Sequence, residues 1–336
     1  MKLASYLRNG SERLAIYHDG WLYDMETLNA KLPNNMNLFL RSWDDYFPVA
    51  LATNQSLLDG EIHGIHGVPV ATAHLLAPVP HPASCRDGYA FRQHVAAARK
   101  NRRVDMIPEF DQYPVFYFTN HQSIQGPGDV LCMPDHFEKL DFELEVAVVI
   151  CRHARNITAA AADDYIGGYM IMNDMSARRL QMEEMLLNLG PAKGKDFATV
   201  IGPWLVTPDE LEKYNVPAKK GHVGNSFSLA MKCSVNGVQM SSGNMADMDW
   251  TFAEIIERCA YGVDLYPGDV IGSGTVGTGC FLELNGTGKL NDPNYKEQWL
   301  QPGDRVEMEV EGLGVLSSKV IQEDADFSIL LKKKNT

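Results

Sequence analysis

Residues 141–150 read Asp-Phe-Glu-Leu-Glu-Val-Ala-Val-Val-Ile, passing from alternating acidic and apolar side chains into an unbroken apolar run. Such a run, rich in β-branched residues, is typical of a strand that is buried on both faces. Side chains alternate across a strand, so Asp141, Glu143 and Glu145 are expected on one face. The stretch therefore predicts a central strand with carboxylates near its start.

The two glutamates of this stretch suggest a metal site. Two residues along a strand place Glu143 and Glu145 about 6.6 Å apart. At an effective dielectric constant of about 20, two ionised carboxylates at that distance repel each other by roughly 2.5 kcal/mol. A divalent cation between them reverses the sign, and hard cations prefer oxygen ligands. The alternative interpretation is the solvated face of an edge strand.

The composition is that of an ordinary globular chain. Its 336 residues suggest about two domains or one large one, and 45% are apolar and 22% charged. The net charge of −13 disfavours binding to nucleic acid or to an anionic membrane surface. We expect no signal peptide or membrane-spanning helix, and the six scattered cysteines indicate reduced, buried thiols. These features predict a cytoplasmic protein.

Two parts are expected along the chain, a small N-terminal β-rich domain over residues 1–77 and a catalytic domain over residues 78–336. Three prolines within residues 78–82 form a stiff connector between them. In the first part, strands at 13–17 and 21–23 flank an Asp-Gly turn, and a helix is expected over 38–58. In the second part, strands are predicted at 146–150, 169–172, 226–235, 237–239, 269–271, 280–284 and 305–310, and helices at 159–165 and 176–187.

The segment that leads into the predicted helix at 176–187 carries three polar side chains. Asp174 is expected to cap the N-terminus of this helix. Asp174, Arg178 and Gln181 then lie on one stripe, because residues three and four apart are neighbours on a helix. An acceptor, a cation and an amide would therefore point the same way. The alternative is a capped helix with a surface Asp–Arg pair.

Residues 85–94 offer a carboxylate, a phenol and an imidazole, those of Asp87, Tyr89 and His94. A single histidine is more often structural than catalytic, so this segment alone decides little. Residues 193–199 place the ammonium group of Lys195 in a glycine-flanked turn. An ammonium group is a compact charge that suits an oxyanion, although a solvated loop is the alternative.

A glycine-rich turn at residues 272–279 contains the pattern Gly-x-Gly-x-x-Gly. A dinucleotide site needs a helix after these glycines, and the predicted strand at 280–284 argues against that function. Such a turn still allows backbone amides to approach a ligand closely, and it places Thr275 and Glu283 nearby. A plain turn is the alternative.

Taken together, these segments resemble the fumarylacetoacetate hydrolase family over residues 87–320. The matching patterns are Asp-x-Tyr-x-x-x-x-His at 87–94, Asp-x-Glu-x-Glu at 141–145, Asn-Asp-x-Ser-Ala-Arg-x-x-Gln at 173–181, Gly-Lys-x-Phe at 194–197, Gly-Asp-Val-Ile-x-Ser-Gly-Thr at 268–275 and Pro-Gly-Asp-x-Val-Glu at 302–307. Their joint occurrence in this order outweighs the structural alternative for each one.

The resemblance implies a fold, an assembly and a set of site residues. The fold is α+β and β-rich: a mixed β-roll or β-sandwich catalytic domain of the fumarylacetoacetase type with a small N-terminal β-rich domain, in a homodimer. One divalent metal ion is implied, Mg or Ca, with Mn as a further candidate. The metal-site residues are Asp87, Glu143, Glu145 and Asp174, with Lys195 and Thr199 beside them. The catalytic residues are His94 as the base that activates water, Glu283 as the carboxylate that orients it, and Lys195. The substrate contacts are Tyr89, Arg178, Gln181, Thr275 and an arginine after His94, for which Arg99, Arg102 and Arg103 compete.

The resemblance also implies a reaction, hydrolysis of a carbon–carbon bond in a 1,3-diketo acid. The spacing between Tyr89 and His94 resembles that of the hydrolase of tyrosine catabolism, so the expected substrate is the dicarboxylate fumarylacetoacetate, giving fumarate and acetoacetate. The alternatives on the same scaffold are acylpyruvate hydrolysis and isomerisation or decarboxylation of a hydroxy-dienoate. Substrate contacts around Arg99–Arg103 and Met185 would discriminate among them. A non-catalytic metal-binding β-roll is the alternative of another class.

Overall fold

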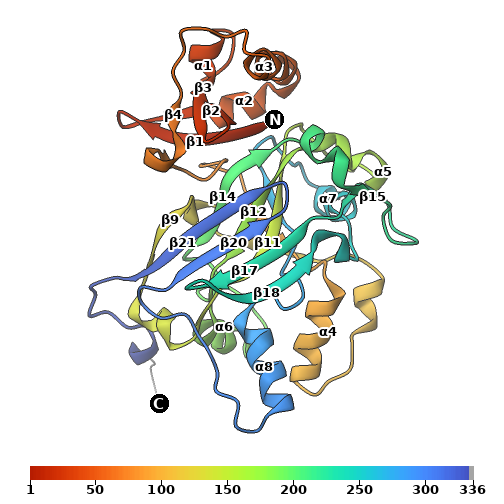
Figure 1. The fold of residues 1–336 in the computed structure, drawn as a ribbon. Helices are drawn as coiled ribbons and strands as arrows, with labels where there is room; N and C mark the ends of the chain where they lie inside the picture. The colour runs from red at the N-terminus through yellow and green to blue at the C-terminus, as the bar shows by residue number, and fades with distance from the viewer. Residues whose placement is uncertain (333–336) are drawn as a thin grey trace.

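A central mixed sheet organises the molecule, and the computed structural model describes residues 1–332 (Figure 1). Its strands run in the order β4-β3-β2-β1-β14-β12-β11-β19-β6-β7, with β5 and β8 paired beside them. The strand bounds are β1 Lys2–Arg8, β2 Ser11–His18, β3 Trp21–Asp24, β4 Val68–Pro69, β5 His74–Leu75, β6 Cys85–Gly88, β7 Phe116–Thr119, β8 Ile124–Gln125, β11 Leu144–Ile150, β12 Ile166–Asp174, β14 Thr199–Val206 and β19 Val270–Gly272.

Strand β11 lies inside this sheet, between β12 and β19, and all seven of its residues are buried. Leu144, Val146 and Val148 contribute to the hydrophobic cluster on one face, and Ala147 and Val149 contribute to the cluster on the other. The prediction of a central strand buried on both faces is therefore confirmed.

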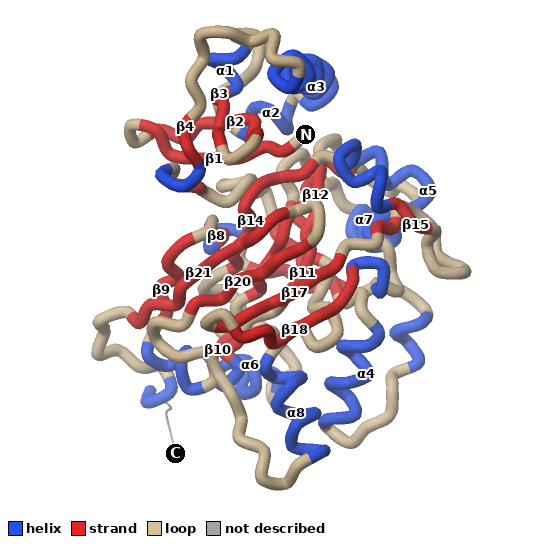
Figure 2. Tube along the Cα trace, viewed as in Figure 1, coloured by secondary structure: helices blue, strands red, loops and turns tan. Residues whose placement is uncertain are grey.

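A second sheet covers one face of the first, as Figure 2 shows. Its order is β18-β17-β20-β21-β9, and the bounds are β9 Gly128–Cys132, β17 Ala230–Val235, β18 Val238–Asn244, β20 Arg305–Val310 and β21 Gly314–Gln322. Two short pairs complete the strands, β10 Leu140–Asp141 with β13 Ser176–Ala177 and β15 Asn215–Val216 with β16 Ser226–Phe227. The two facing layers form the α+β, β-rich fold that the sequence predicts.

Helices flank these sheets, and α4 and α8 lie side by side below them in Figure 1. The bounds are α1 Met25–Leu28, α2 Met36–Arg41, α3 Trp43–Leu58, α4 Arg92–Asn101, α5 Ala159–Ala162, α6 Arg178–Met185, α7 Phe252–Ala260 and α8 Phe281–Asn291. No helix within residues 1–332 is long and apolar enough to cross a membrane. All six cysteines are free and buried, as expected.

The N-terminal residues extend the central sheet, because β1 pairs antiparallel with β14. Leu3, Ile16 and Phe39 from this part share a hydrophobic cluster with Val149 and Leu205 from the rest of the chain. The hairpin of β2 and β3 has its turn at Asp19-Gly20, as predicted. The division into domains at residue 77 stays a prediction.

Four predicted elements differ from the structure. The strand predicted over 226–235 is two strands, β16 and β17, which belong to different sheets. Residues 280–284 begin helix α8 and are not a strand, because the Asp141 carboxylate accepts hydrogen bonds from the Phe281 and Leu282 amides at 2.7 and 2.9 Å. Residues 38–58 form parts of two helices, α2 and α3. Asp174 ends β12 and does not cap a helix, because Ser176–Ala177 pair with β10 and α6 begins only at Arg178.

The correction at α8 changes the argument about the glycine-rich turn, since a helix does follow it. The first turn of that helix is the position that a pyrophosphate occupies in a dinucleotide site. Here the carboxylate of Asp141 already accepts its first amides. The N-terminus of α8 is therefore occupied by a side chain of the protein itself.

A buried carboxylate holds the N-terminal part together, and its removal should destabilise the fold. Asp24 accepts hydrogen bonds from Arg13 at 2.6 and 2.7 Å and from the Thr27 amide at 3.0 Å. Burial raises the pKa of Asp24, but the hydrogen bonds from Arg13 and Thr27 outweigh burial and hold the pKa below its usual value. Asp24→Asn should lower the free energy of unfolding at pH 7 by about 1–3 kcal/mol in urea denaturation.

The effect should depend on pH with a definite sign. The contribution of Asp24 is complete above the pKa of aspartate in the unfolded chain and is lost as the pH falls through the lower pKa of the folded chain. The difference between wild type and Asp24→Asn should therefore shrink in acid. Asp324→Asn, at an exposed loop position, is the control. Equal stability of Asp24→Asn and wild type at pH 7 would contradict this account.

Candidate active site

A cavity of about 640 Å³ opens between α4, α6 and α8. Most of the predicted site residues line it, namely Asp87, Tyr89, His94, Glu143, Arg178, Gln181, Lys195, Thr275 and Glu283. Glu145, Asp174 and Thr199 are also buried, at 0%, 0% and 1% exposed. Thr199 lies opposite Asp174 in the pairing of β14 with β12. The structure therefore brings segments that are far apart in sequence to one place.

Three carboxylates converge near the ends of three strands of the central sheet. Asp87, Glu145 and Asp174, on β6, β11 and β12, each offer a ligand atom, and these atoms lie within 4.8 Å of one another. Burial, followed by the charge of Asp174, raises the pKa of Asp87 to about 7. Burial, followed by the charges of Asp87 and Asp174, raises the pKa of Glu145 well above its usual value. We call these three residues the acidic triad.

The donor set of the acidic triad fits a hard divalent cation. Glu145 Oε2 and Asp174 Oδ1 are buried and have no hydrogen-bond partner within the described chain. An orphaned buried acceptor is costly, and a cation removes that cost. Two further oxygens are oriented by hydrogen bonds, Asp87 Oδ1 by the Gly274 amide at 3.0 Å and Asp174 Oδ2 by the Tyr117 hydroxyl at 2.6 Å. Oxygen ligands suit Mg, Ca and Mn.

Gly274 is needed where it lies. Its φ is +78°, and a Cβ there would meet the Gly88 carbonyl oxygen at 2.6 Å. Any other residue would push the turn away from β6, and the amide that donates to Asp87 would move with it. The glycine-rich turn therefore serves a carboxylate of the protein.

Glu143 lies outside the acidic triad, contrary to the regular alternation expected along the strand. It stands between β10 and β11, so it does not share the pleat of Glu145. Its carboxylate accepts hydrogen bonds from Lys195 and, at 2.6 Å, from Arg178. Burial raises the pKa of Glu143, but the charges of Arg178 and Lys195 outweigh it and hold the pKa well below its usual value. Lys195 also donates to Asp174 at 2.6 Å, which links Glu143 to the triad.

His94 and Glu283 form a buried pair on the cavity wall. His94 on α4 places Nδ1 2.6 Å from Glu283 Oε2 on α8. The Thr278 amide donates to the other Glu283 oxygen at 3.0 Å. Thr278 has φ +68°, a strained conformation for a β-branched residue, which aims this amide at the carboxylate. The pair is therefore fixed from both sides.

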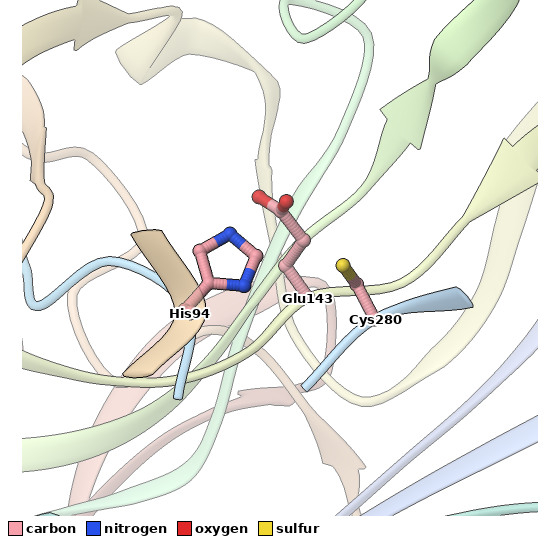
Figure 3. Close-up of side chains that lie close together, drawn as sticks. All are labelled: His94, Glu143 and Cys280. Atoms are coloured by element: carbon pink, nitrogen blue, oxygen red, sulfur yellow. The ribbon is translucent and has the colours of Figure 1, made fainter. Parts of the chain in front are cut away.

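A second group of close side chains consists of His94, Glu143 and Cys280 (Figure 3). Burial raises the pKa of the Cys280 thiol well above its usual value. Cys280 Sγ accepts a hydrogen bond from the Glu283 amide at 3.4 Å. Both Glu143 oxygens are engaged by cations, as described above. These contacts favour a neutral thiol that caps α8 over a thiolate that binds metal.

The arginines after His94 differ in position. Arg102 lines the cavity, whereas Arg99 and Arg103 do not. The Arg99 side chain donates to the Asp105 carbonyl, and Arg103 is exposed. Arg178 lines the cavity, but its guanidinium group is engaged by Asp141, Glu143 and Gln181.

Several residues of the site escaped the sequence reasoning. Tyr117 donates to Asp174, and Asp141 caps α8, although neither role had been predicted. The three consecutive aromatic residues at 116–118 indicate a strand but say nothing about a hydrogen-bond partner for Tyr117. The sequence pattern placed Asp141 on one strand face with Glu143 and Glu145. It did not show that the Asp141 carboxylate points to the N-terminus of α8.

Comparison with known proteins gives the relationship. The chain is 29% identical over 309 residues to oxaloacetate tautomerase Fahd2a, mitochondrial, of Rattus norvegicus, covering 90% of this chain and 84% of that protein. Fumarylacetoacetate hydrolase from Exiguobacterium antarcticum matches in structure with a TM-score of 0.68 at 22% identity, covering 96% of this chain and 100% of that one. Maleylpyruvate hydrolase from Sphingobium sp. SYK-6, solved with manganese(II) ion and pyruvate, matches with a TM-score of 0.67 at 20% identity and the same coverage.

The two solved structures show that the fold is shared. The model of the family described as fumarylacetoacetate (FAA) hydrolase C-terminal matches residues 84–321. That range spans more than two thirds of the chain and holds both the acidic triad and the His94–Glu283 pair. The chain belongs to the fumarylacetoacetate hydrolase family, a family of enzymes.

Proposed function

We propose that this protein is a metal-dependent hydrolase that cleaves a carbon–carbon bond in a 1,3-diketo acid. The observation that carries the proposal is the buried His94–Glu283 pair, which shares a cavity with the acidic triad member Asp87. A positioned imidazole with a carboxylate on its far nitrogen is the arrangement of a general base. Fumarylacetoacetate and the acylpyruvates are members of this substrate class.

The proton path follows from the hydrogen bond of His94. Glu283 accepts a hydrogen bond from Nδ1–H, which leaves Nε2 as the acceptor for a proton of water. The water oxygen then bonds to the acyl carbonyl carbon, and the neighbouring carbon–carbon bond breaks with its electron pair going to the leaving carbon. His94 returns the proton to that carbon. The products are a carboxylic acid and a shorter keto acid.

We assign the divalent ion to Asp87, Glu145 and Asp174, with Thr199 beside them, and Glu143 would join as a fourth carboxylate if the oxygen that Lys195 now engages turned to the ion. When bound, such an ion supplies a Lewis acid for the two ketone oxygens of the substrate. Lys195 holds Glu143 and Asp174 in place and carries a positive charge beside the developing oxyanion. The manganese in the maleylpyruvate hydrolase structure supports a divalent ion, and Mg and Ca fit the same oxygens.

Substrate positioning is assigned to residues that line the cavity and have hydrogen-bonding capacity. We infer that Arg102 binds a substrate carboxylate, and that Tyr89, Gln181 and Thr275 contact the substrate. Arg178 acts by orienting Glu143 and Gln181, since its own nitrogens donate to them.

A second candidate function is keto–enol tautomerisation of oxaloacetate. The observation that favours it is the similarity over 90% of this chain to a mitochondrial oxaloacetate tautomerase. Tautomerisation also needs a base such as His94, but it consumes no water. The cavity of about 640 Å³ is larger than a four-carbon diacid fills, which favours the longer diketo acids.

One experiment separates these functions. Fumarylacetoacetate, acetylpyruvate, a hydroxy-dienoate diacid and enol-oxaloacetate would be assayed spectrophotometrically with Mg, Mn or Ca and with EDTA. The reactions would be run in water enriched in oxygen-18. Hydrolysis places the label in the carboxylic acid product, and tautomerisation releases no such product. Conversion of enol-oxaloacetate alone would overturn the proposed hydrolase.

A homodimer and a cytoplasmic location stay predictions of the sequence. Size-exclusion chromatography with light scattering tests the first, and cell fractionation tests the second. The relative from Rattus norvegicus is named as a mitochondrial protein, so fractionation should compare the cytoplasm with mitochondria.

Removal of the imidazole should slow turnover strongly and leave the metal site intact. His94→Asn should lower kcat by about 10²–10⁴-fold, because the base that takes the proton of water is lost. His81→Asn, at an exposed histidine that pairs with Glu12, is the control. Wild-type turnover in His94→Asn would remove this residue from the mechanism.

Loss of a triad carboxylate should release the ion. Glu145→Gln should lower the bound metal after dialysis by about tenfold or more, measured by elemental analysis, since a charged ligand is replaced by a neutral one. Glu283→Gln makes the same chemical change on the other side of the cavity and should retain the ion. A wild-type metal content in Glu145→Gln would contradict the ligand assignment.

The choice among the arginines can be measured as substrate affinity. Arg102→Gln should raise KM by about 10–100-fold, because a charged hydrogen bond to a carboxylate is worth about 1.5–3 kcal/mol. Arg103→Gln removes a neighbouring exposed charge and is the matched control. If Arg103→Gln raises KM and Arg102→Gln does not, the assignment is reversed.

A further inference from the structure

A second cavity of about 300 Å³ lies beside the catalytic cavity. Tyr89, Arg102 and Val115 line both, so the two spaces adjoin. We call the smaller one the annex. Its wall comes mainly from the segment between α4 and β7, together with Trp250, which precedes α7.

The wall of the annex is mainly apolar. Ile107, Phe110, Tyr113 and Trp250 belong to it and do not line the catalytic cavity. Ile107 and Tyr113 line the annex and are 38% and 41% exposed, so part of their apolar surface is accessible. Such surface beside a ligand cavity marks a place where an apolar group is buried on binding.

This wall is held in position by contacts within the protein. The Trp250 indole donates to the Phe110 carbonyl at 2.8 Å, and Phe110 itself is buried. The Arg258 guanidinium lies 4.8 Å from the centre of the Tyr113 ring. The indole has its polar atom satisfied and leaves its carbon atoms for packing. The annex is therefore a built feature of the fold.

The position of the annex relates it to the reacting carbon. The Tyr89 ring meets the His94 ring edge to face, with centroids 5.9 Å apart, and Tyr89 is part of the wall that the two cavities share. In the proposed reaction, water adds to the acyl carbonyl next to His94. Tyr89 thus stands between His94 and the annex, and a group attached to that carbonyl is within reach of the annex.

The described residues of the annex offer no free charged partner to a second substrate carboxylate. Arg102 lies where the two cavities meet, but in the proposed function it is already engaged by the first carboxylate of the substrate. The two other charged residues of the annex, Glu109 and Arg99, have opposite signs, and the Arg99 side chain already donates to the Asp105 carbonyl. A second substrate carboxylate pushed into the annex would lose water against an apolar wall.

We propose that the annex binds the group carried by the acyl carbonyl of the substrate and selects apolar or aromatic groups. This inference rests on the proposed hydrolase function and specifies its substrate class. The favoured substrates are 2,4-dioxo acids with an alkyl or aryl acyl group, rather than acids with a second carboxylate at that end.

The test uses the metal-loaded enzyme and 2,4-dioxo acids that differ only in the acyl group, namely methyl, n-pentyl, phenyl and a carboxylated chain. The value of kcat/KM should rise from methyl to phenyl by about tenfold or more, because a few buried carbon atoms discriminate by that amount. Equal values, or a preference for the methyl or carboxylated acid, would overturn the annex and leave the hydrolase standing.

A variant in which a larger side chain fills the annex provides a second test. Ile107→Trp should lower the ratio of kcat/KM for the phenyl acid to that for the methyl acid by about tenfold, since the larger side chain occupies the space. Ile329→Trp, also at an isoleucine that is 38% exposed, should keep the wild-type ratio. An unchanged ratio in Ile107→Trp would contradict the proposal.

The failure of the proposed function would be visible separately. If none of these acids is cleaved, the hydrolase assignment fails, and titration calorimetry with the same uncleaved acids then decides the annex. Tighter binding of the phenyl acid in wild type, lost in Ile107→Trp, would support the annex. Equal affinities would overturn it.

Discussion

The charge balance inside the protein is the constraint on which the site depends. Among the buried carboxylates are Asp87, Asp141, Glu143, Glu145 and Asp174, and the buried cations beside them are Arg178 and Lys195. Arg178 is shared between Asp141 and Glu143, so the acidic triad is left with Lys195 alone. Unpaired buried charge is costly, and the raised pKa values in the triad express that cost. A divalent cation is the simplest partner for such a group.

Asp141 joins this charge balance to the proton-transfer pair. The Asp141 carboxylate accepts hydrogen bonds from the first amides of α8 and from the Arg178 side chain. Helix α8 carries Glu283, and Arg178 orients Glu143, so both depend on the same carboxylate. A negative group also suits a helix N-terminus. The geometry of the base and the geometry of the acids are therefore coupled through a residue that touches neither the cavity nor the triad.

Sequence reasoning succeeded where local pattern decides the outcome. Strand β20 has the predicted bounds, 305–310, and the apolar run of β11 is buried on both faces. It failed where a distant residue decides. Residues 280–284 have the local composition of a strand, and the cap that makes them a helix comes from Asp141. That the site residues converge could be predicted only from the family resemblance, since no local pattern relates residues on β6, β11 and β12. The choice of Arg102 over Arg99 and Arg103 required the structure, because only the structure shows which arginine lines the cavity.

Relatives named as hydrolases and as tautomerases share this fold, and a physical reason can be given for that range. A carboxylate cluster that attracts a cation and an imidazole that moves one proton serve either reaction, because both begin by moving a proton near a ketone. Hydrolysis adds two demands, an attacking water and room for the acyl group. The space for the acyl group is set by residues such as Ile107 and Trp250, which belong neither to the acidic triad nor to the His94–Glu283 pair. Substrate range within one scaffold is then a property of the surrounding wall, which can change while the charge balance at the centre is kept.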